Sequence, residues 1–380
     1  MLTVDDAGNF VCCTTDECVR NDFEALCAQR SGTVASITCK WQSRAPLPMP
    51  MLELHSNRMP GQLLSAYFHW KHRVKTSTIH HVSANQRRLD WTRNPDRWHA
   101  AIQRIRKHSR PNIPAPRIKY LALEHNSAMH SCTHFRASVS KHYCDVESAQ
   151  TVLDFSAGWG DRLSGFLAAP TVEHIVLIDP RKGSIEACKK QHGFVNSTKR
   201  LECFRDCAES ILPTLSSGVF DLVLSSPPYF DLELYGETES EARGQIRLKA
   251  TCVDDYVRVF LVPVLTHAVR VLRKGGLLVL NLDDNKKRSV FVCQPALDLL
   301  ASCDELTFVG TAGLRKGKGF GNGGNKDASA PRVEPLYVYR KTGTKGRDES
   351  AVMESDDERR EHREHDRFGP LAGPRMRTGR

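Results

Sequence analysis

Residues 150–341 alternate short apolar runs with helical patterns, and this alternation constrains the fold more than any other feature of the chain. The seven runs of strand length are residues 152–155, 174–179, 201–205, 220–225, 277–282, 306–311 and 335–340. Helical patterns fill the first gaps, notably at residues 185–192 and 253–272. Strands that alternate with helices form βαβ units, so we predict an α/β fold with helices on both faces of a largely parallel sheet. No helical pattern separates the last two runs, which predicts a terminal antiparallel pair.

The length and composition bound what surrounds this sheet. The chain has 380 residues, enough for one large domain with an appendage or for two domains. No apolar run reaches the roughly 18 residues of a membrane-spanning helix, and Asp5 and Asp6 argue against a signal or transit peptide. The 13 cysteines are too sparse for a disulfide scaffold. We therefore expect an intracellular protein of the nucleus or cytoplasm, neither secreted nor bound to a membrane, with reduced thiols.

The positive charge is concentrated in one segment. The chain carries a formal net charge of +10. Residues 55–145 hold 16 Lys and Arg against 4 Asp and Glu, together with 11 of the 16 His. A basic patch of this kind is typical of proteins that bind a polyanion such as nucleic acid. A solvated surface on a basic protein is the alternative.

The chain divides by composition into four parts. Residues 1–54 predict an irregular segment, and residues 55–132 a basic, mostly helical region that could bind nucleic acid. Residues 133–341 contain the α/β domain, and the polar residues 342–380, with balanced charge, predict a disordered tail. The first segment holds five cysteines without the paired short spacings of a zinc site, so we predict no metal. They are Cys12, Cys13, Cys18, Cys27 and Cys39.

One helix of the basic region has a clear start. Asn94-Pro95-Asp96 offers a cap, a proline for the first turn and an acid near the positive end of the helix dipole. Trp98, Ile102 and Ile105 follow with helical spacing and form one apolar stripe. Basic residues cover the rest of this helix. It could lie along a phosphate backbone or pack on the main domain with its charged face in water.

The first strand of the α/β domain leads into a glycine turn at Gly158-Trp159-Gly160. Glycines permit a tight turn and the close approach of a ligand to the backbone. The dinucleotide fingerprint is absent because Leu163 stands at its third glycine position, and no P-loop follows. The turn therefore suits a nucleoside ligand without a pyrophosphate. The next strand ends in Asp179, at the spacing of an acid that binds ribose hydroxyls in doubly wound sheets.

A buried strand at residues 220–225 ends abruptly in Ser226-Pro227-Pro228-Tyr229. Proline fixes its own φ angle and has no N–H, so the loop is stiff and its carbonyls remain available as acceptors. A hydroxyl, a free carbonyl and a flat aromatic ring together form a plausible holder for a planar amine. The alternative, a Pro-Pro turn that only stops a strand, does not account for the adjacent aromatic residues.

Together these stretches resemble the class I S-adenosylmethionine-dependent methyltransferases, and within them the DNA amino-methyltransferases of adenine N6 or cytosine N4. The resemblance covers roughly residues 133–341. It rests on the cofactor loop at 154–160, the ribose acid Asp179, the adenine-side stretch at 206–208 and the catalytic (Asp/Asn/Ser)-Pro-Pro-Tyr loop. Residues 134–139 are similar to the segment at the methionine end of the cofactor, although closely similar members have proline in place of Ala137. Residues 230–235 and 334–339 are similar to a phage- and virus-type branch.

The resemblance implies a Rossmann-like seven-stranded sheet, the cofactor S-adenosylmethionine and a set of site residues. The implied catalytic residues are Ser226, Pro227, Pro228 and Tyr229. The implied cofactor-binding residues are Phe135, Asp154, Ser156, Ala157, Gly158, Gly160, Asp179, Asp206 and Cys207. Candidate substrate contacts are Phe230, Tyr235 and, in a basic Gly-rich loop, Arg315, Lys316 and Lys318. That basic loop is equally a solvated connection between strands.

The resemblance further implies methylation of an exocyclic amine in DNA, and the serine form of the motif leans toward cytosine N4. Ser226 Oγ and the Pro227 carbonyl would accept the hydrogens of the amine, and Tyr229 would stack on the base. The chain has no Pro-Cys dipeptide, so covalent cytosine-C5 chemistry is not expected. Three alternatives remain open: an RNA base amine, a protein glutamine, and a non-catalytic nucleic-acid-binding module on the same fold.

Overall fold

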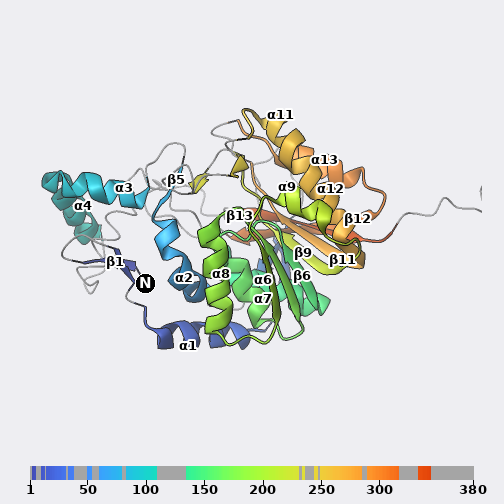
Figure 1. Ribbon diagram of the computed structural model, residues 1–380, viewed down its shortest axis with the longest axis horizontal. Helices are drawn as coiled ribbons and strands as arrows, with labels where there is room; N and C mark the ends of the chain where they lie inside the picture. The colour runs from blue at the N-terminus through green and yellow to red at the C-terminus, as the bar shows by residue number, and fades with distance from the viewer. Residues whose placement is uncertain are drawn as a thin grey trace, which may run out of the picture. The chain divides into compact units, whose positions relative to one another are not determined.

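The predicted strands assemble into one sheet in the computed structural model (Figure 1). Seven of its strands run in the order β12–β13–β11–β9–β6–β7–β8. Their bounds are β6 (Thr151–Asp154), β7 (His174–Ile178), β8 (Arg200–Phe204), β9 (Phe220–Ser225), β11 (Leu272–Asn281), β12 (Leu306–Arg315) and β13 (Val333–Lys341). Neighbours from β11 to β8 pair in parallel, whereas β13 is antiparallel to both β11 and β12. The Rossmann-like seven-stranded sheet and its terminal antiparallel pair are therefore confirmed.

Helices cover both faces of this sheet, as predicted (Figure 1). One face carries α6 (Ala137–Glu147), α7 (Asp161–Ala168) and α8 (Lys182–Phe194), and the other carries α9 (Ala208–Ile211), α12 (Val262–Val271) and α13 (Cys293–Ala301). Successive strand residues point to opposite faces. Accordingly, Val152 and Leu222 belong to the core under α7, while Leu153 and Val223 belong to the core under α12. Burial on both sides explains why the strands are continuous apolar runs.

The helix predicted over residues 253–272 is present with an irregularity at its centre. It consists of α11 (Val253–Tyr256), a π-helical turn η3 (Val257–Leu261) and α12. Pro263 has no N–H to donate to the carbonyl four residues earlier, and the π-helical turn stands at this break in the ladder. The helix is followed directly by β11, which begins five residues before the predicted strand.

The first segment contains regular elements, so the prediction that residues 1–54 are irregular is wrong. The elements are β1 (Leu2–Val4), β2 (Phe10–Cys12), α1 (Asp16–Cys27), β3 (Thr33–Ile37) and β4 (Met49–Glu53). The side chain of Thr15 caps α1 by accepting a hydrogen bond from the Cys18 N–H. Val19 and Leu26 are the buried residues of this helix. The strands are too short to show alternation in the sequence. β4 pairs with β12 and β3 with β4, which extends the main sheet.

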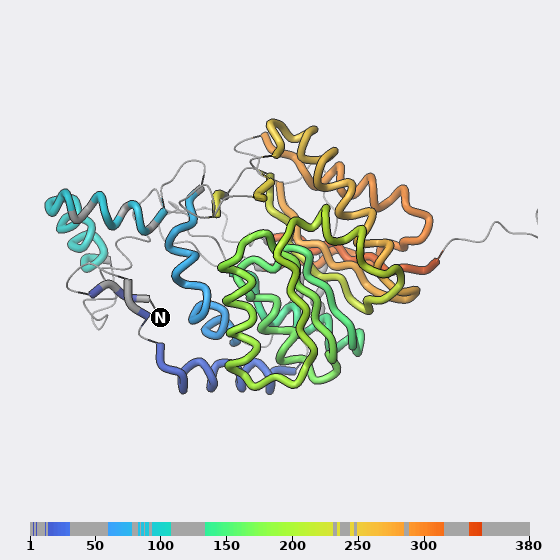
Figure 2. The backbone as a smooth tube through the Cα atoms, viewed as in Figure 1, coloured from blue at the N-terminus to red at the C-terminus, as the bar shows by residue number. Residues whose placement is uncertain are grey.

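The basic region is helical where it is described, as predicted. It contains α2 (Gln62–Arg73), β5 (Thr76–Thr78), α3 (Ala84–Thr92) and α4 (Pro95–His108). The last helix begins at the predicted proline, and its apolar stripe is less exposed than its basic residues. In contrast to a separate region ending at residue 132, α2 packs against α7 and α8 (Figure 2). β5 also pairs with β10 (Glu233–Tyr235), beyond the predicted catalytic loop.

The structure describes residues 2–5, 10–12, 14–30, 33–37, 49–53, 60–78, 83–108, 134–230, 233–235, 244–246, 249–284, 289–315 and 333–343. Residues 1–342 form one compact unit, so the predicted boundaries at 54 and 132 do not separate compact bodies. The predicted disordered tail lies outside the described residues beyond Gly343. Among the helices in the described ranges, none has the length and apolar character to cross a membrane.

Candidate active site

The predicted motifs meet at one edge of the sheet. β9, β6 and β7 are adjacent and parallel, so the loops that follow them emerge side by side at their carboxyl ends. One buried hydrogen bond joins two of these loops, because Ser225 Oγ at the end of β9 donates to Asp154 Oδ1 at the end of β6 (2.8 Å). The predicted catalytic loop therefore begins beside the predicted cofactor loop.

The glycine turn has the backbone geometry that its sequence predicts. Gly158 and Gly160 have φ angles of 57° and 68°, in the left-handed region that disfavours a side chain. The Ala157 N–H donates to the Ile178 carbonyl (3.0 Å), which holds the turn against the end of β7. A Cβ atom on Gly160 would lie 2.4 Å from Gln191 Oε1 and 2.8 Å from His69 Nε2. Both conformation and space thus require glycine at residue 160.

Asp154 is buried completely and supports the turn from below. Its Oδ1 accepts from the Ser156 N–H (3.1 Å) as well as from Ser225, and its Oδ2 accepts from Arg162 Nε (2.7 Å). The Arg162 guanidinium also contacts the Ser156 carbonyl. Because three donors already surround this carboxylate, Asp154 positions the loop and does not present its oxygens to a ligand.

Asp179 ends β7 where the sequence predicts a ribose-binding acid, and its carboxylate is held by two neighbours. The Gly158 N–H donates to Oδ2 (2.9 Å) and the Arg181 N–H donates to Oδ1 (2.9 Å). The Arg181 side chain adds Nε at 3.2 Å and Nη2 at 3.3 Å, and its Nη2 also reaches the Gly158 carbonyl at 3.2 Å. A hydroxyl ligand at Asp179 would therefore share the carboxylate with Arg181 or displace it.

Arg181 lies between two aromatic rings that no sequence argument assigned to a common site. Its guanidinium carbon is 4.5 Å from the centre of the Trp159 ring and 4.6 Å from that of Tyr235. The two rings meet edge to face at 5.7 Å. Such cation–π contacts stabilise a guanidinium when it is shielded from water. Tyr235, predicted to contact substrate, is thereby placed beside the glycine turn, and the pairing of β10 with β5 brings it there.

The two proline carbonyls of the Ser-Pro-Pro-Tyr loop differ in the hydrogen bonds that they already accept. The Pro228 carbonyl already accepts from the Phe230 N–H (2.9 Å) and from the Tyr256 hydroxyl (2.9 Å). Within the part of the chain that the structure describes, no hydrogen bond is recorded for the Pro227 carbonyl. Proline supplies no N–H at residues 227 and 228, so this loop leaves acceptors rather than donors. The acceptor role of the Pro227 carbonyl stays a prediction, and it requires a carbonyl that is open to a ligand.

Tyr229 is anchored by a carboxylate from the opposite end of the chain. Its hydroxyl donates to Glu334 Oε1 at 2.6 Å and lies 3.4 Å from Ser226 Oγ. Burial, reinforced by the charge of Glu334, raises the pKa of Tyr229 well above its usual range. Sequence reasoning noted the stretch around Glu334 but did not assign this residue to the site. No local pattern could do so, because Glu334 arrives only when β13 pairs with β11.

Asp206 and Cys207 lie at the end of β8, the next strand beyond β7. Asp206 is exposed, and its Oδ1 accepts from the Cys207 N–H (2.7 Å). Cys207 is buried, donates to the Gly244 carbonyl (3.3 Å) and accepts from Lys249 Nζ (3.0 Å). Burial raises the pKa of Cys207, although Lys249 opposes the shift. The exposed Asp206 carboxylate is the one of this pair that can face a ligand.

The segment before α6 is tied to α7 and to the basic region. The Phe135 N–H donates to Asp161 Oδ2 (3.1 Å), and His134 Nδ1 lies 3.0 Å from Asp161 Oδ1. Ser65 of α2 also contacts this carboxylate. Burial alone would raise the pKa of Asp161, but His134, Arg73 and Ser65 outweigh it and lower the pKa. The predicted cofactor-binding segment is therefore positioned by α2, which sequence reasoning assigned to a different region.

The remaining substrate candidates are Phe230 and three residues of the basic loop, and the structure places only Phe230 among them with its side chain. The Phe230 ring is 8% exposed and packs on Tyr256 with ring centres 5.8 Å apart, so it belongs to the core. Its φ angle of 55° shows that the loop bends sharply at this residue. Arg315 ends β12, and its side chain lies outside the described part of the structure. Lys316 and Lys318 lie outside the described residues altogether.

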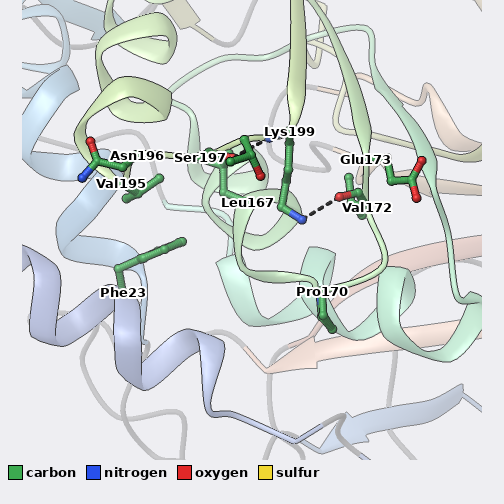
Figure 3. Close-up of a pocket in the computed structure, with 10 residues that line it drawn as sticks. Phe23, Leu167, Pro170, Val172, Glu173, Val195, Asn196, Ser197 and Lys199 are labelled. Carbon is green, nitrogen blue, oxygen red and sulfur yellow. Dashed lines mark hydrogen bonds between the residues drawn. The ribbon is translucent and has the colours of Figure 1, made fainter.

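A cavity of about 400 Å³ lies away from these motifs (Figure 3). It is lined by Phe23 of α1 and by residues that precede β7 and β8, including Glu173 and Lys199. These residues stand at the amino ends of the strands, opposite the edge that holds Asp179 and Ser226. Lys199 Nζ donates to the Ala169 and Val172 carbonyls (2.7 and 2.6 Å). The cavity therefore lies apart from the candidate site.

Comparisons with known proteins give a likeness of fold only. No family model and no curated protein matches the chain. Among solved structures, a putative rRNA methylase from Clostridium thermocellum is 14% identical, with a TM-score of 0.37, and the match covers 56% of this chain and 99% of that one. The O-methyltransferase TomG from Streptomyces achromogenes, in complex with SAM, is 16% identical, with coverages of 65% and 90% and a TM-score of 0.36.

A putative RNA methyltransferase from Pyrococcus horikoshii is 11% identical, with coverages of 55% and 83% and a TM-score of 0.33. All three of these structures are described as methyltransferases. At such identities and TM-scores, the likeness decides neither the family nor the activity of this chain.

Proposed function

We propose that the protein is an S-adenosylmethionine-dependent methyltransferase that modifies an exocyclic amine of a nucleobase in DNA, with cytosine N4 favoured over adenine N6. The observation that carries this proposal is the arrangement at the carboxyl edge of the sheet. Ser226 Oγ and the Pro227 carbonyl stand there as acceptors, and the Ser225–Asp154 hydrogen bond links their loop to the glycine turn. An amine held by two acceptors beside a nucleoside-binding turn is suited to alkylation at nitrogen.

The residues present fit the cofactor. The left-handed Gly158 and Gly160 leave backbone without side chains at the turn, Asp179 offers a carboxylate for the ribose hydroxyls, and Asp206 offers a second carboxylate. The bound cofactor would supply an electrophilic methyl group on a sulfonium. Asp179 is 4% exposed, and binding at its oxygens would rearrange the Arg181 contacts described above.

The loop residues would prepare the amine for attack. The lone pair of an exocyclic amine is conjugated with the base, which makes the nitrogen a poor nucleophile. Ser226 Oγ and the Pro227 carbonyl would accept its two hydrogens and favour a pyramidal nitrogen with an available lone pair. Acceleration would come mainly from positioning and fixed dipoles. In duplex DNA the base must first be flipped out of the stack.

The basic region supports a polyanionic substrate. Residues 55–145 carry the excess of Lys and Arg, and the exposed residues of α4 include Arg97, Arg104, Arg106 and Lys107. Contacts from such side chains to phosphates contribute affinity without sequence preference. A protein-glutamine substrate would not account for this charge.

The test begins with transfer of labelled methyl groups to DNA and RNA, each single- and double-stranded, with the products digested to nucleosides and identified by mass spectrometry. N4-methylcytosine or N6-methyladenine from DNA would support the proposal and identify the base. Label found only in RNA would support the proposed methyl transfer but would show that the substrate is RNA and not DNA. The absence of label in both, with the cofactor bound, would contradict the proposed activity and favour a protein substrate or a binding module.

Substitution of Ser226 tests the assigned site. We expect Ser226→Ala to slow transfer by about 100-fold or more, because one preorganised acceptor of the amine is lost. Cofactor affinity, measured by calorimetry, should be unchanged. The matched control is Ser302→Ala, whose hydroxyl is exposed at the end of α13 and donates to the Leu299 carbonyl (2.8 Å). Wild-type turnover in Ser226→Ala would show that the active site lies elsewhere.

A further inference from the structure

The predicted catalytic serine begins a chain of hydroxyl groups that ends at a carboxylate. Ser226 Oγ lies 3.4 Å from the Tyr229 hydroxyl, and that hydroxyl lies 2.6 Å from Glu334 Oε1. Glu334 stands near the start of β13, which enters the sheet antiparallel to β11. Its carboxylate therefore reaches the same edge of the sheet as the end of β9, although 105 residues separate it from Tyr229.

The direction of these hydrogen bonds follows from the chemistry of the groups. A carboxylate only accepts, so the Tyr229 hydroxyl must donate to Glu334. The raised pKa of Tyr229 keeps its proton in place at any working pH, so the hydroxyl stays a donor. The Tyr229 oxygen is then an acceptor for the Ser226 hydroxyl, and Ser226 Oγ retains lone pairs that face away from this bond. The 3.4 Å separation is long, as such bonds often are before substrate binds.

From this arrangement we propose that Ser226, Tyr229 and Glu334 form a proton relay, with Glu334 as the terminal acceptor of the proton that the methylated amine must lose. The inference rests on the proposed function. As the N–C bond forms, the carbon–sulfur bond breaks and its electron pair stays on sulfur. The amine proton passes to Ser226 Oγ, the serine proton passes to the Tyr229 oxygen, and the tyrosine proton passes to Glu334. Glu334 then releases it to water.

The relay accounts for the Glu334 carboxylate behind Tyr229 and for the fixed position of the Tyr229 ring. A site that only accepts hydrogen bonds from the amine needs neither. An amine held only by a serine hydroxyl and a carbonyl has two neutral acceptors and no anionic group to receive its proton. Glu334 supplies that anionic acceptor through the hydroxyls of Ser226 and Tyr229. Tyr229 is also held by the Asn281 carbonyl at a longer distance (3.5 Å), so its ring is fixed in one place by both β11 and β13. A fixed ring keeps the middle member of the relay in line.

The experiment measures single-turnover methyl transfer with enzyme in excess over an oligonucleotide. We expect Glu334→Gln and Tyr229→Phe each to slow transfer by about 100-fold, the usual scale of general acid–base catalysis. The dissociation constants of S-adenosylmethionine, by calorimetry, and of the oligonucleotide, by fluorescence anisotropy, should stay at wild-type values. Matched controls are Tyr339→Phe, on the same strand, and Glu305→Gln, whose carboxylate pairs with Lys341 (3.3 Å) at the far end of β12. Both controls should keep the wild-type rate.

Chemical rescue separates proton acceptance from a structural role. Added formate should restore transfer in Glu334→Ala, because a small carboxylate can occupy the vacated place. Formate should not rescue Tyr229→Phe, in which the relay is broken one step earlier. A slow Glu334→Ala variant without formate rescue would overturn the relay, as would a Glu334→Gln variant with the wild-type rate. In either case an inactive Ser226→Ala would leave the proposed function standing, whereas an inactive wild-type protein would overturn that function itself.

Discussion

Asp154 and Asp179 end neighbouring strands, yet their surroundings give them different roles. Asp154 is fully buried under the glycine turn and accepts hydrogen bonds from Ser156, Arg162 and Ser225. The two side-chain donors to Asp179 both belong to Arg181, which is 11% exposed, so movement of this one residue would free both oxygens of the carboxylate, whereas the side-chain donors to Asp154 come from two separate residues. A side chain can rotate away from a carboxylate more readily than a backbone amide. Asp179 is therefore the acid that a ligand can reach.

Substitution of Arg181 should reveal whether ribose hydroxyls and the Arg181 side chain compete for the Asp179 carboxylate. In the absence of cofactor, Arg181→Ala leaves the buried Asp179 with fewer donors and should lower the free energy of unfolding by about 2 kcal/mol. Saturating S-adenosylmethionine should recover part of this loss, because ribose hydroxyls would replace the missing donors. The measurement is chemical denaturation with and without cofactor. An equal loss under both conditions would contradict a ribose site at Asp179. Arg200→Ala, an exposed arginine paired with Glu202, is the control.

Helix α2 completes the site from outside the predicted α/β domain. Ser65 contacts Asp161 at the start of α7, and the buried His69 lies beside Gly160 and 3.8 Å from Cys188. The N-terminus of α2 is fixed in turn by α1, because Asp22 accepts from the Leu63 N–H (2.8 Å). Loss of α2 from its place would therefore disturb the glycine turn. The helix is a structural part of the site as well as part of the basic region.

The pH dependence of stability should report on the docking of α2. Burial lowers the pKa of His69 from 6.5 to about 3, so His69 is neutral in the folded protein. Because the unfolded chain binds the proton more readily, stability is complete above pH 6.5 and falls as the pH drops from 6.5 toward 3. The expected loss between pH 8 and pH 5 is about 2 kcal/mol.

Denaturation curves of His69→Gln across this range should show a smaller slope than the wild type. Part of the remaining pH dependence would come from His142, whose pKa is also lowered by burial. The matched control is His99→Gln, which changes an exposed histidine on α4. An unchanged slope in His69→Gln would show that His69 is not the titrating group.

At the scale of the whole molecule, the segment with the net positive charge is not the segment that carries the candidate catalytic residues. The carboxyl edge supplies acceptors and carboxylates, whereas the net positive charge is concentrated in residues 55–145, where Asp and Glu are few. A polyanion bound to exposed cations would deliver its base to the sheet edge. This division predicts that the cations of α4 determine the affinity for nucleic acid. They should not change the rate of methyl transfer once the nucleic acid is bound.

The triple variant Arg104→Gln, Arg106→Gln, Lys107→Gln should therefore bind nucleic acid more weakly at every sequence. Each lost phosphate contact should reduce the slope of log affinity against log salt by about 1. The matched control removes three exposed cations of α8, Lys182, Lys189 and Lys190. Anisotropy titrations over a range of salt concentrations provide the measurement. Equal effects of the two triple variants would contradict a specific role for α4.

Much of the site was predictable because its signals are local. Asp179 and the Ser226-Pro227-Pro228 loop directly follow apolar strands, and the glycines at 158 and 160 follow a few residues after another. Parallel strands end at one edge of the sheet. The irregular assignment of residues 1–54 failed because strands of three to five residues carry too little periodicity. Phe230 was expected at the substrate, but the sharp bend at that residue turns its ring into the core.

The sequence by itself determined the strands, their polar ends and the helices between them, because hydrophobic periodicity and turn chemistry depend on neighbouring residues. Tertiary structure alone decided which distant residues join them. The insertion of β13 between β11 and β12 brought Glu334 to Tyr229, and the packing of α2 brought Ser65 and His69 to the glycine turn. Arg181 reached Tyr235 only through the pairing of β10 with β5. Such contacts depend on sheet order and on the packing of whole elements, which no local pattern encodes.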